Sequence, residues 1–210
     1  MLDEPACDHI VTSVDQLEQI FERPQGAALM KEVDHINASY RALIEAAPFF
    51  ALATCGPEGL DCSPRGDPAG FVRVADEKTL LIPDRRGNNR IDSLRNIVRD
   101  PRVALMFMIP GCGEVVRVVG EAAISTDPEL RAQFVMHDKV PKVVLVVTVG
   151  QVYYQCPKAL VRSKLWEPDT WLDRKTLPTP GKILNEITGG KHDAEKHDRE
   201  YPARLKATIY

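Results

Sequence analysis

The chain is organised around residues 80–97, LLIPDRRGNNRIDSLRNI. An apolar strand ends at Pro83, and a turn rich in arginine and asparagine leads into an amphipathic helix. Because the first N–H groups of a helix lack partners and carry the positive end of its dipole, such a turn suits a phosphate. Arg85, Arg86 and Arg90 add planar donors of the kind that bind phosphate. The local pattern leaves two interpretations open, an anion site and a solvated loop before a surface helix.

Short apolar segments separated by turn signals surround this stretch. The predicted strands are 49–54, 60–64, 71–74, 79–83, 102–109, 115–124 and 142–154. Most of them are joined by short turns rather than by helical crossovers. The pattern therefore favours a mainly β fold, an antiparallel barrel of six to seven strands with peripheral helices, over alternating βαβ winding.

Helices are predicted on both sides of the strand-rich region. Ser13 reads as an N-cap before apolar residues at helical spacing, and a second helical pattern over 36–47 ends at a proline. Asp127–Met136 and Cys156–Trp166 are predicted as short helices, and 182–187 as another within a loose tail. We expect these helices to lie outside the barrel.

The chain of 210 residues is long enough for one domain with extensions. The predicted organisation is a helical extension over 1–48, a barrel over 49–166 and a C-terminal extension over 167–210. We expect the last extension to pack on a neighbouring subunit.

The composition argues against two classes of partner. The net charge of -3 and the apolar content of 44% favour neither a nucleic acid nor a membrane. The apolar runs around 104–110 and 143–149 fall far short of the roughly 18 to 20 residues that a membrane span needs. The first residues show no signal-peptide pattern. We therefore expect a cytoplasmic protein.

Cysteines and histidines give no sign of a metal site. The five cysteines, Cys7, Cys55, Cys62, Cys112 and Cys156, are widely spread and form no C-x-x-C pair. They are expected to be reduced and mostly packed as small hydrophobic side chains. The five histidines are scattered without ligand spacing, so no metal is predicted.

Several motifs flank the opening stretch in a fixed order. They are SPRGD at 63–67, GFV at 70–72, IPDRRGNNR at 82–90, DSL at 92–94, NI at 96–97, PRV at 101–103 and RVVG at 117–120. Together they resemble the pyridoxamine 5'-phosphate oxidase-related flavoproteins over roughly residues 10–170. Each motif is weak alone, whereas the ordered set is specific.

The resemblance implies a split β-barrel homodimer that binds one FMN at each of two equivalent sites on the subunit interface. The residues it implies for the phosphate or ribityl chain are Arg65, Arg86, Asn88, Asn89, Arg90 and Ser93. The residues it implies along the isoalloxazine ring are Ser63, Pro64, Ile82, Pro83 and Asp84. The residues it implies from the partner subunit are Arg117, Lys158, Arg162 and Trp166.

Some of these residues have a second interpretation. Lys158 or Arg162 would stabilise the negative charge of a reduced flavin, whereas their helix taken alone favours a solvated basic face. Trp166 suits either the flavin face or core packing. For Asp67 we favour a structural role, binding Arg65 or a backbone N–H, over a catalytic one. Cysteines 62 and 156 are expected to pack rather than to act as thiols near the ring.

The resemblance does not fix the reaction. The leading hypothesis is an FMN-dependent oxidoreductase that transfers hydride between flavin N5 and a small molecule, with no side chain that stands out as catalytic. One alternative is a flavin-binding or storage module without turnover. Another is a true pyridoxamine 5'-phosphate oxidase, although residues 181–210 lack the usual Arg-x-His element. A further alternative is a relative of this fold that takes haem or a deazaflavin, and FMN is favoured over haem because the motif region holds no histidine.

Overall fold

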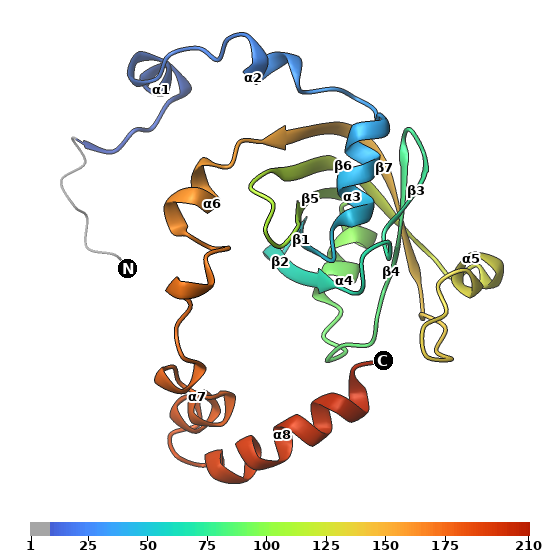
Figure 1. Ribbon diagram of the computed structural model, residues 1–210, viewed down its shortest axis with the longest axis vertical. Helices are drawn as coiled ribbons and strands as arrows, with labels where there is room; N and C mark the ends of the chain where they lie inside the picture. Colours follow the sequence, from blue (N-terminus) through green and yellow to red (C-terminus); the bar gives the residue numbers. More distant parts are fainter. Residues whose placement is uncertain (1–8) are drawn as a thin grey trace. The chain divides into compact units, whose positions relative to one another are not determined.

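The computed structural model describes residues 9–210 (Figure 1). Residues 1–8, which include Cys7 and the start of the predicted 1–48 extension, lie outside the described residues. The chain divides into a first unit that ends at Glu32 and a second unit, Val33–Tyr210. The domain boundaries predicted after residues 48 and 166 stay predictions.

The first unit contains two short helices. Helix α1, Val14–Ile20, begins as predicted after Ser13, whose Oγ accepts a hydrogen bond from the Gln16 N–H at 3.2 Å. The Gln16 side chain accepts in turn from the Ser13 N–H, which completes a capping box. Helix α2, Ala27–Met30, follows Gly26, whose φ of +58° suits glycine. Neither helix buries a residue.

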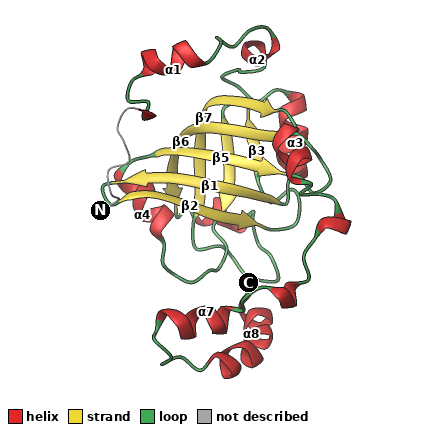
Figure 2. Ribbon diagram, turned by 90° about the vertical axis from the view of Figure 1, so that its left-hand side faces the viewer, coloured by secondary structure: helices red, strands yellow, loops and turns green. Residues whose placement is uncertain are grey.

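The second unit is built on one antiparallel sheet of seven strands (Figure 2). The strands are β1 Phe49–Gly56, β2 Gly59–Gly66, β3 Arg73–Asp76, β4 Thr79–Pro83, β5 Arg102–Met108, β6 Val115–Ser125 and β7 Val144–Gln155. Their order is β2-β1-β5-β6-β7-β4-β3, and every neighbouring pair is antiparallel. The predicted split β-barrel with peripheral helices is confirmed.

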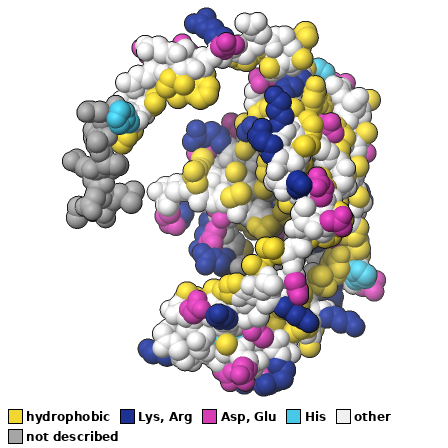
Figure 3. All heavy atoms as spheres, turned by 60° about the vertical axis from the view of Figure 1, so that its left-hand side comes forward, with side chains coloured by type: hydrophobic (Ala, Val, Ile, Leu, Met, Phe, Trp, Pro, Cys, Tyr) yellow, Lys and Arg dark blue, Asp and Glu magenta, His cyan; other side chains and the backbone are white. Residues whose placement is uncertain are grey.

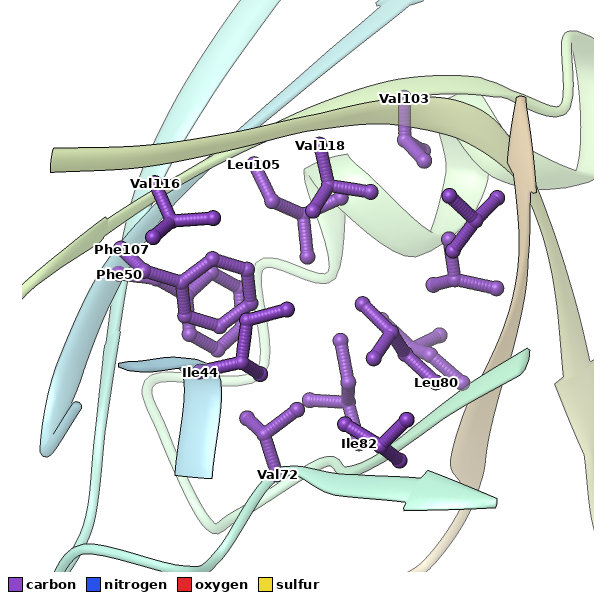
Figure 4. Close-up of a cluster of buried hydrophobic side chains, with 14 of the residues drawn as sticks. Ile44, Phe50, Val72, Leu80, Ile82, Val103, Leu105, Phe107, Val116 and Val118 are labelled. Atoms are coloured by element: carbon purple, nitrogen blue, oxygen red, sulfur yellow. The ribbon is translucent and has the colours of Figure 1, made fainter. Parts of the chain in front are cut away.

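Cross-strand pairs fill the barrel interior. Strands β1 and β5 place Phe50 opposite Phe107 and Leu52 opposite Leu105, and all four side chains are buried. The rings of Phe50 and Phe107 lie 5.0 Å apart between centroids (Figure 4). Because side chains alternate between the two faces of a strand, this register sends every second residue into one core.

Helix α3, Ala38–Ala46, packs against β3, β6 and β7. Its N-cap is Asn37, whose Oδ1 accepts from the Tyr40 N–H at 2.9 Å. Tyr40 and Ile44 lie one turn apart and are buried in the barrel core. The second predicted helix therefore supplies part of the core.

Helix α4, Asp92–Arg99, is fixed on β1 by a buried polar contact. Asn96 donates its side-chain N–H to Thr54 Oγ1 at 3.1 Å. A Cβ at Gly56 would lie 2.3 Å from Asn96 Oδ1, so glycine is required for this close approach. Ile97 joins the core beside it. These contacts hold the helix against β1 and the core, and the turn before it is placed accordingly.

Helix α5, Pro128–Ala132, begins after the predicted N-cap Asp127 but ends earlier than the predicted Asp127–Met136 segment. Met136, the predicted last residue of the helix, instead pairs with Lys139 in a tight hairpin turn. The two residues inside that turn, His137 and Asp138, have φ of +48° and +59°, so a helix cannot continue through it.

The remaining helices are α6 Lys158–Ser163, α7 Pro180–Ile187 and α8 Ala194–Thr208, with single 3-10 turns at Pro168–Thr170 and Arg174–Thr176. Helix α8 corrects the prediction of a loose tail. It contains Pro202 and buries no residue, so no apolar stripe marked it in the sequence.

Figure 3 shows charged side chains of both signs on the surface of the molecule. Within residues 9–210, no helix is both long and apolar enough to cross a membrane.

The predicted packing of the cysteines as small buried side chains is wrong for the described ones. Cys62 and Cys156 are exposed, and Cys55 and Cys112 are partly exposed. Strand β2 lies at one edge of the sheet, and Cys156 follows the end of β7, so neither thiol is covered.

A surface ion pair beside the β3–β4 turn gives a pH-dependent prediction. Lys78 Nζ donates to Asp34 Oδ2 at 2.7 Å, and His35 Nδ1 lies 3.0 Å from Oδ1. Chiefly through the Lys78 hydrogen bond, and then through His35, the pKa of Asp34 falls from 3.8 to about 2. A lowered pKa means that the stabilisation is present above pH 3.8 and is lost as the pH falls towards about 2.

An NMR titration of the Asp34 carboxyl carbon should therefore show a midpoint near 2. In the Lys78→Met variant, the midpoint should rise towards 3.8. An identical midpoint in both proteins would show that Lys78 does not perturb this carboxyl group.

Candidate functional site

A cavity of about 990 Å³ lies where the end of β2 faces the turn between β4 and α4. Ten of the fifteen predicted site residues line it: Ser63, Pro64, Arg65, Pro83, Asp84, Arg86, Asn88, Asn89, Arg90 and Ser93. The two motifs, some twenty residues apart in sequence, thus face one space. This juxtaposition follows from the strand order, because β2 and β4 lie near opposite ends of the sheet and meet only when it curls.

An ion pair links the two motifs across this gap. Arg65 Nη1 donates to Asp84 Oδ1 at 2.5 Å, and both side chains are largely buried. The Nε of Arg65 is also buried and makes no hydrogen bond to any residue of the described chain. A buried N–H without a partner is costly, so a polar ligand group in the cavity would relieve it.

A second ion pair lies deeper. Arg85 Nε donates to Asp67 Oδ2 at 2.5 Å, and Arg85 Nη1 donates to the Phe134 carbonyl at 2.6 Å. The Asp67 side chain is only 1% exposed. The expected structural role of Asp67 fits this geometry, but its partner is Arg85 and not Arg65. Arg85 is one of the three arginines considered as phosphate donors. Because it already binds Asp67 and the Phe134 carbonyl, it is less available to a phosphate than Arg86.

The other oxygen of Asp67 binds a residue far away in sequence. Tyr210 Oη donates to Asp67 Oδ1 at 2.7 Å, and the Tyr210 ring lies 4.7 Å from the His137 ring between centroids. The hydrogen bond to the carboxylate raises the pKa of Tyr210. Each oxygen of this buried carboxylate thus has a donor.

The turn itself is shaped by left-handed backbone. Asn89 and Ile91 have φ of +60° and +53°, and Asn88 Oδ1 accepts from the Arg90 N–H at 3.0 Å. Asparagine tolerates this region and hydrogen-bonds its own backbone, which explains the Asn-Asn pair. Because the N-cap Ile91 offers no side-chain acceptor, the first N–H groups of α4 have no cap.

Two arginines of the turn differ in their partners. Arg90 Nε donates to Asp92 Oδ2 at 2.8 Å, which raises the pKa of Arg90. Arg86 is exposed and makes no hydrogen bond or ion pair within residues 9–210. Arg86 is therefore the turn's free cation in the described chain. An anion bound at this turn could use all the donors of Arg86, whereas it would share the donors of Arg90 with Asp92.

Ser93 is held close to the cavity by a second carboxylate. Its buried Oγ donates to Asp61 Oδ2 at 2.6 Å, which ties the first turn of α4 to β2. A ligand oxygen that replaced this partner would receive the same hydrogen bond.

Five predicted site residues do not line the cavity. The Ile82 side chain points into the core and is 2% exposed, because every second residue of β4 faces inward. Arg117 lies over the Tyr153 ring at 5.2 Å. Lys158 and Arg162 are exposed on α6. Trp166 Nε1 donates to the Cys112 carbonyl at 2.8 Å. The role of the last four in a partner's site stays a prediction.

The cavity has one wall that the sequence did not predict. It is formed by the segment 139–143 and by Phe71 and Tyr210. Lys139 and Lys142 are exposed there and add positive charge. Their only signal in the sequence is a basic pair around Pro141, which is common in surface loops.

Within the described residues, no group of three or more His, Cys, Asp or Glu is placed to hold a metal.

The fold and this cavity together define a split-barrel protein with an arginine-lined cavity. Residues 36–156, more than half of the chain, match the family described as pyridoxamine 5'-phosphate oxidase. The chain therefore belongs to the pyridoxamine 5'-phosphate oxidase family of FMN-binding proteins. No curated protein matches the sequence.

Three solved structures illustrate the similarity. HupZ from Group A Streptococcus is 20% identical, with a TM-score of 0.48 over 58% of this chain and 94% of HupZ. A protein proposed as a pyridoxamine 5'-phosphate oxidase from Lactobacillus delbrueckii is also 20% identical, with a TM-score of 0.47 over 59% and 99%. An FMN-binding protein from Syntrophomonas wolfei is 15% identical, with a TM-score of 0.43 over 54% and 82%.

Proposed function

We propose that this protein is an FMN-dependent oxidoreductase that acts on a small molecule. The supporting observation is the cavity in which the β2 edge, the end of β4 and the uncapped start of α4 meet. When bound, FMN would supply the chemistry, hydride transfer at its N5 atom. The protein would bind and orient the cofactor.

The chemistry of the lining fits both ends of FMN. The cofactor's phosphate would lie at the start of α4, near Arg86 and the Asn88–Arg90 turn, where N–H groups and cations are available. The flavin ring would lie along Ser63–Arg65 and Pro83–Asp84, where the buried Arg65 Nε needs an acceptor.

The visible absorption spectrum of the purified protein tests FMN binding. We expect flavin bands, either as isolated or after addition of FMN, with one FMN per chain released on denaturation. A colourless protein that takes up no added FMN would overturn the proposal.

Turnover is tested separately from binding. Reduced holoprotein should be reoxidised by a small-molecule acceptor faster than free reduced FMN under the same conditions. A holoprotein that protects its reduced flavin from every acceptor would instead be a storage module. Oxidation of pyridoxamine 5'-phosphate would identify a true oxidase of that substrate.

We also propose that the active form is a homodimer with two shared sites. Exposed basic residues on α6, Lys158 and Arg162, have no ion-pair partner within residues 9–210, and they lie outside the cavity of their own chain. In a dimer of the proposed kind, they would complete the partner's site.

Mixing two defective variants tests this arrangement. Arg86→Ala/Arg90→Ala removes the turn cations, and Lys158→Ala/Arg162→Ala removes those of α6. Each variant alone should bind FMN weakly, whereas a mixed dimer has one fully intact site. Mixing after mild dissociation should therefore restore up to one tight FMN site per mixed dimer. If mixing restores none, the site lies within one chain.

A further inference from the structure

Tyr210 lies two residues after α8 and contributes to the cavity wall. Its Oη donates to Asp67 Oδ1 at 2.7 Å, and Asp67 Oδ2 accepts from Arg85 at 2.5 Å. Arg85 is the residue directly before Arg86 in the anion-binding turn. A chain of two hydrogen bonds therefore connects residue 210 to the segment that presents the turn's cations.

The Tyr210 side chain makes a ring contact in addition to its hydrogen bond. The Tyr210 ring packs on the His137 ring at 4.7 Å between centroids. His137 is held in a tight hairpin turn, Met136–Lys139, by two backbone hydrogen bonds of 3.0 and 2.9 Å. The carbonyl of Phe134, just before that turn, accepts from Arg85 at 2.6 Å. The hydroxyl of Tyr210 is thus linked to Arg85 through Asp67, and its ring is linked to Arg85 through the hairpin turn that follows Phe134.

Helix α8 has few other means of being held. It pairs with α7, where the Gly181 N–H donates to Asp198 Oδ1 at 2.8 Å and a Cβ at Gly181 would lie 2.4 Å from the Ala194 carbonyl. Yet α8 buries no residue. The position of the α7–α8 hairpin on the barrel therefore depends strongly on Tyr210.

We propose that Tyr210 is a positioning residue that couples the docking of α8 to the anion-binding turn. When Tyr210 is docked, Asp67 is fully satisfied and holds Arg85 in place, which orders the turn at Arg86–Arg90. A ligand that orders the turn stabilises the docked α8 by the same free energy, since coupling between two sites is reciprocal. The identity of the ligand as FMN rests on the proposed function.

Hydrogen exchange of the full chain, with and without FMN, tests the coupling. In the wild type, FMN should slow amide exchange both in residues 84–91 and in α8. The Tyr210→Phe variant keeps the ring but loses the hydroxyl. It should abolish the effect of FMN on α8 and weaken FMN binding about tenfold, the change that one hydrogen bond to a charged group supports. Tyr201→Phe is the matched control, because Tyr201 stacks on His197 within α8 and should behave as the wild type.

Measurements without ligand keep the inference separate from the proposed function. Tyr210→Phe should exchange faster than the wild type in residues 84–91 and in α8 even when no FMN is present. If these rates are unchanged, the coupling is wrong, whatever the protein binds. If FMN binds the wild type but leaves α8 exchange unaltered, the coupling is also wrong. If the wild type binds no FMN while the ligand-free rates change as expected, only the proposed function fails.

Discussion

Replacing Arg86 and Arg90 together with alanine is expected to lower the affinity for FMN about 100-fold or more. Hydrogen bonds to a charged group contribute about 1.5–3 kcal/mol each, so two lost arginine contacts to a phosphate amount to at least this factor. Arg86 has no partner within residues 9–210 and would lose its whole contact. Arg90 is shared with Asp92, so its part is the smaller of the two. Titration of the apoprotein with FMN, followed by flavin fluorescence, measures the effect.

The matched control is Arg95→Ala/Arg99→Ala, which removes the same charge from helix α4. Neither residue lines the cavity, and their ion pairs with Asp92 and Glu58 are exposed. The control should change FMN affinity only a fewfold, through long-range charge. Equal losses of affinity in both double variants would show that FMN binding depends on the net charge of the protein and not on contacts with the turn.

The Asp67→Ala variant is expected to lose about 3 kcal/mol of unfolding free energy. It removes a carboxylate that is 1% exposed and leaves the largely buried Arg85 without its ion-pair partner. Breaking one side of a buried pair costs about 3–5 kcal/mol, because the remaining charge stays in a poorly solvated place. Urea denaturation of the apoprotein measures the change.

The control for this variant is Asp92→Ala. Asp92 also pairs with an arginine, but Arg90 is 75% exposed in its side chain, and exposed pairs contribute about 0–1 kcal/mol. A loss below 1 kcal/mol in Asp67→Ala would contradict the stabilising role of the buried Arg85–Asp67 pair.

The strands were predictable because their signal is local. Alternating burial in β1 and β5 follows from alternating side chains, and the predicted strand ends differ from the observed ones by at most two residues. The turn before α4 was predictable for the same reason, since glycine and asparagine favour turns wherever they lie in the fold, although the left-handed residues are Asn89 and Ile91 and not Gly87. The cavity that joins this turn to residues 63–67 required the resemblance to a family.

The contacts that were not predictable join residues far apart in the chain. Ile82 stays a site candidate only through its backbone, since the two-residue period of β4 turns its side chain into the core. Arg85 reads as a phosphate donor until the fold brings Asp67 to it. Tyr210 carries no local signal, because its partner Asp67 lies 143 residues earlier. Helix α8 lacks an apolar stripe and was therefore not predicted.

In the proposed function, the turn at Arg86–Arg90 binds the phosphate of FMN. The most direct measurement compares the dissociation constants of FMN and riboflavin for the same apoprotein, since riboflavin has the same ring and ribityl chain but no phosphate. We expect FMN to bind at least about 100-fold more tightly than riboflavin, and the Arg86→Ala/Arg90→Ala variant to lose nearly all of this preference. Equal affinity of the wild type for FMN and riboflavin would contradict this role of the turn.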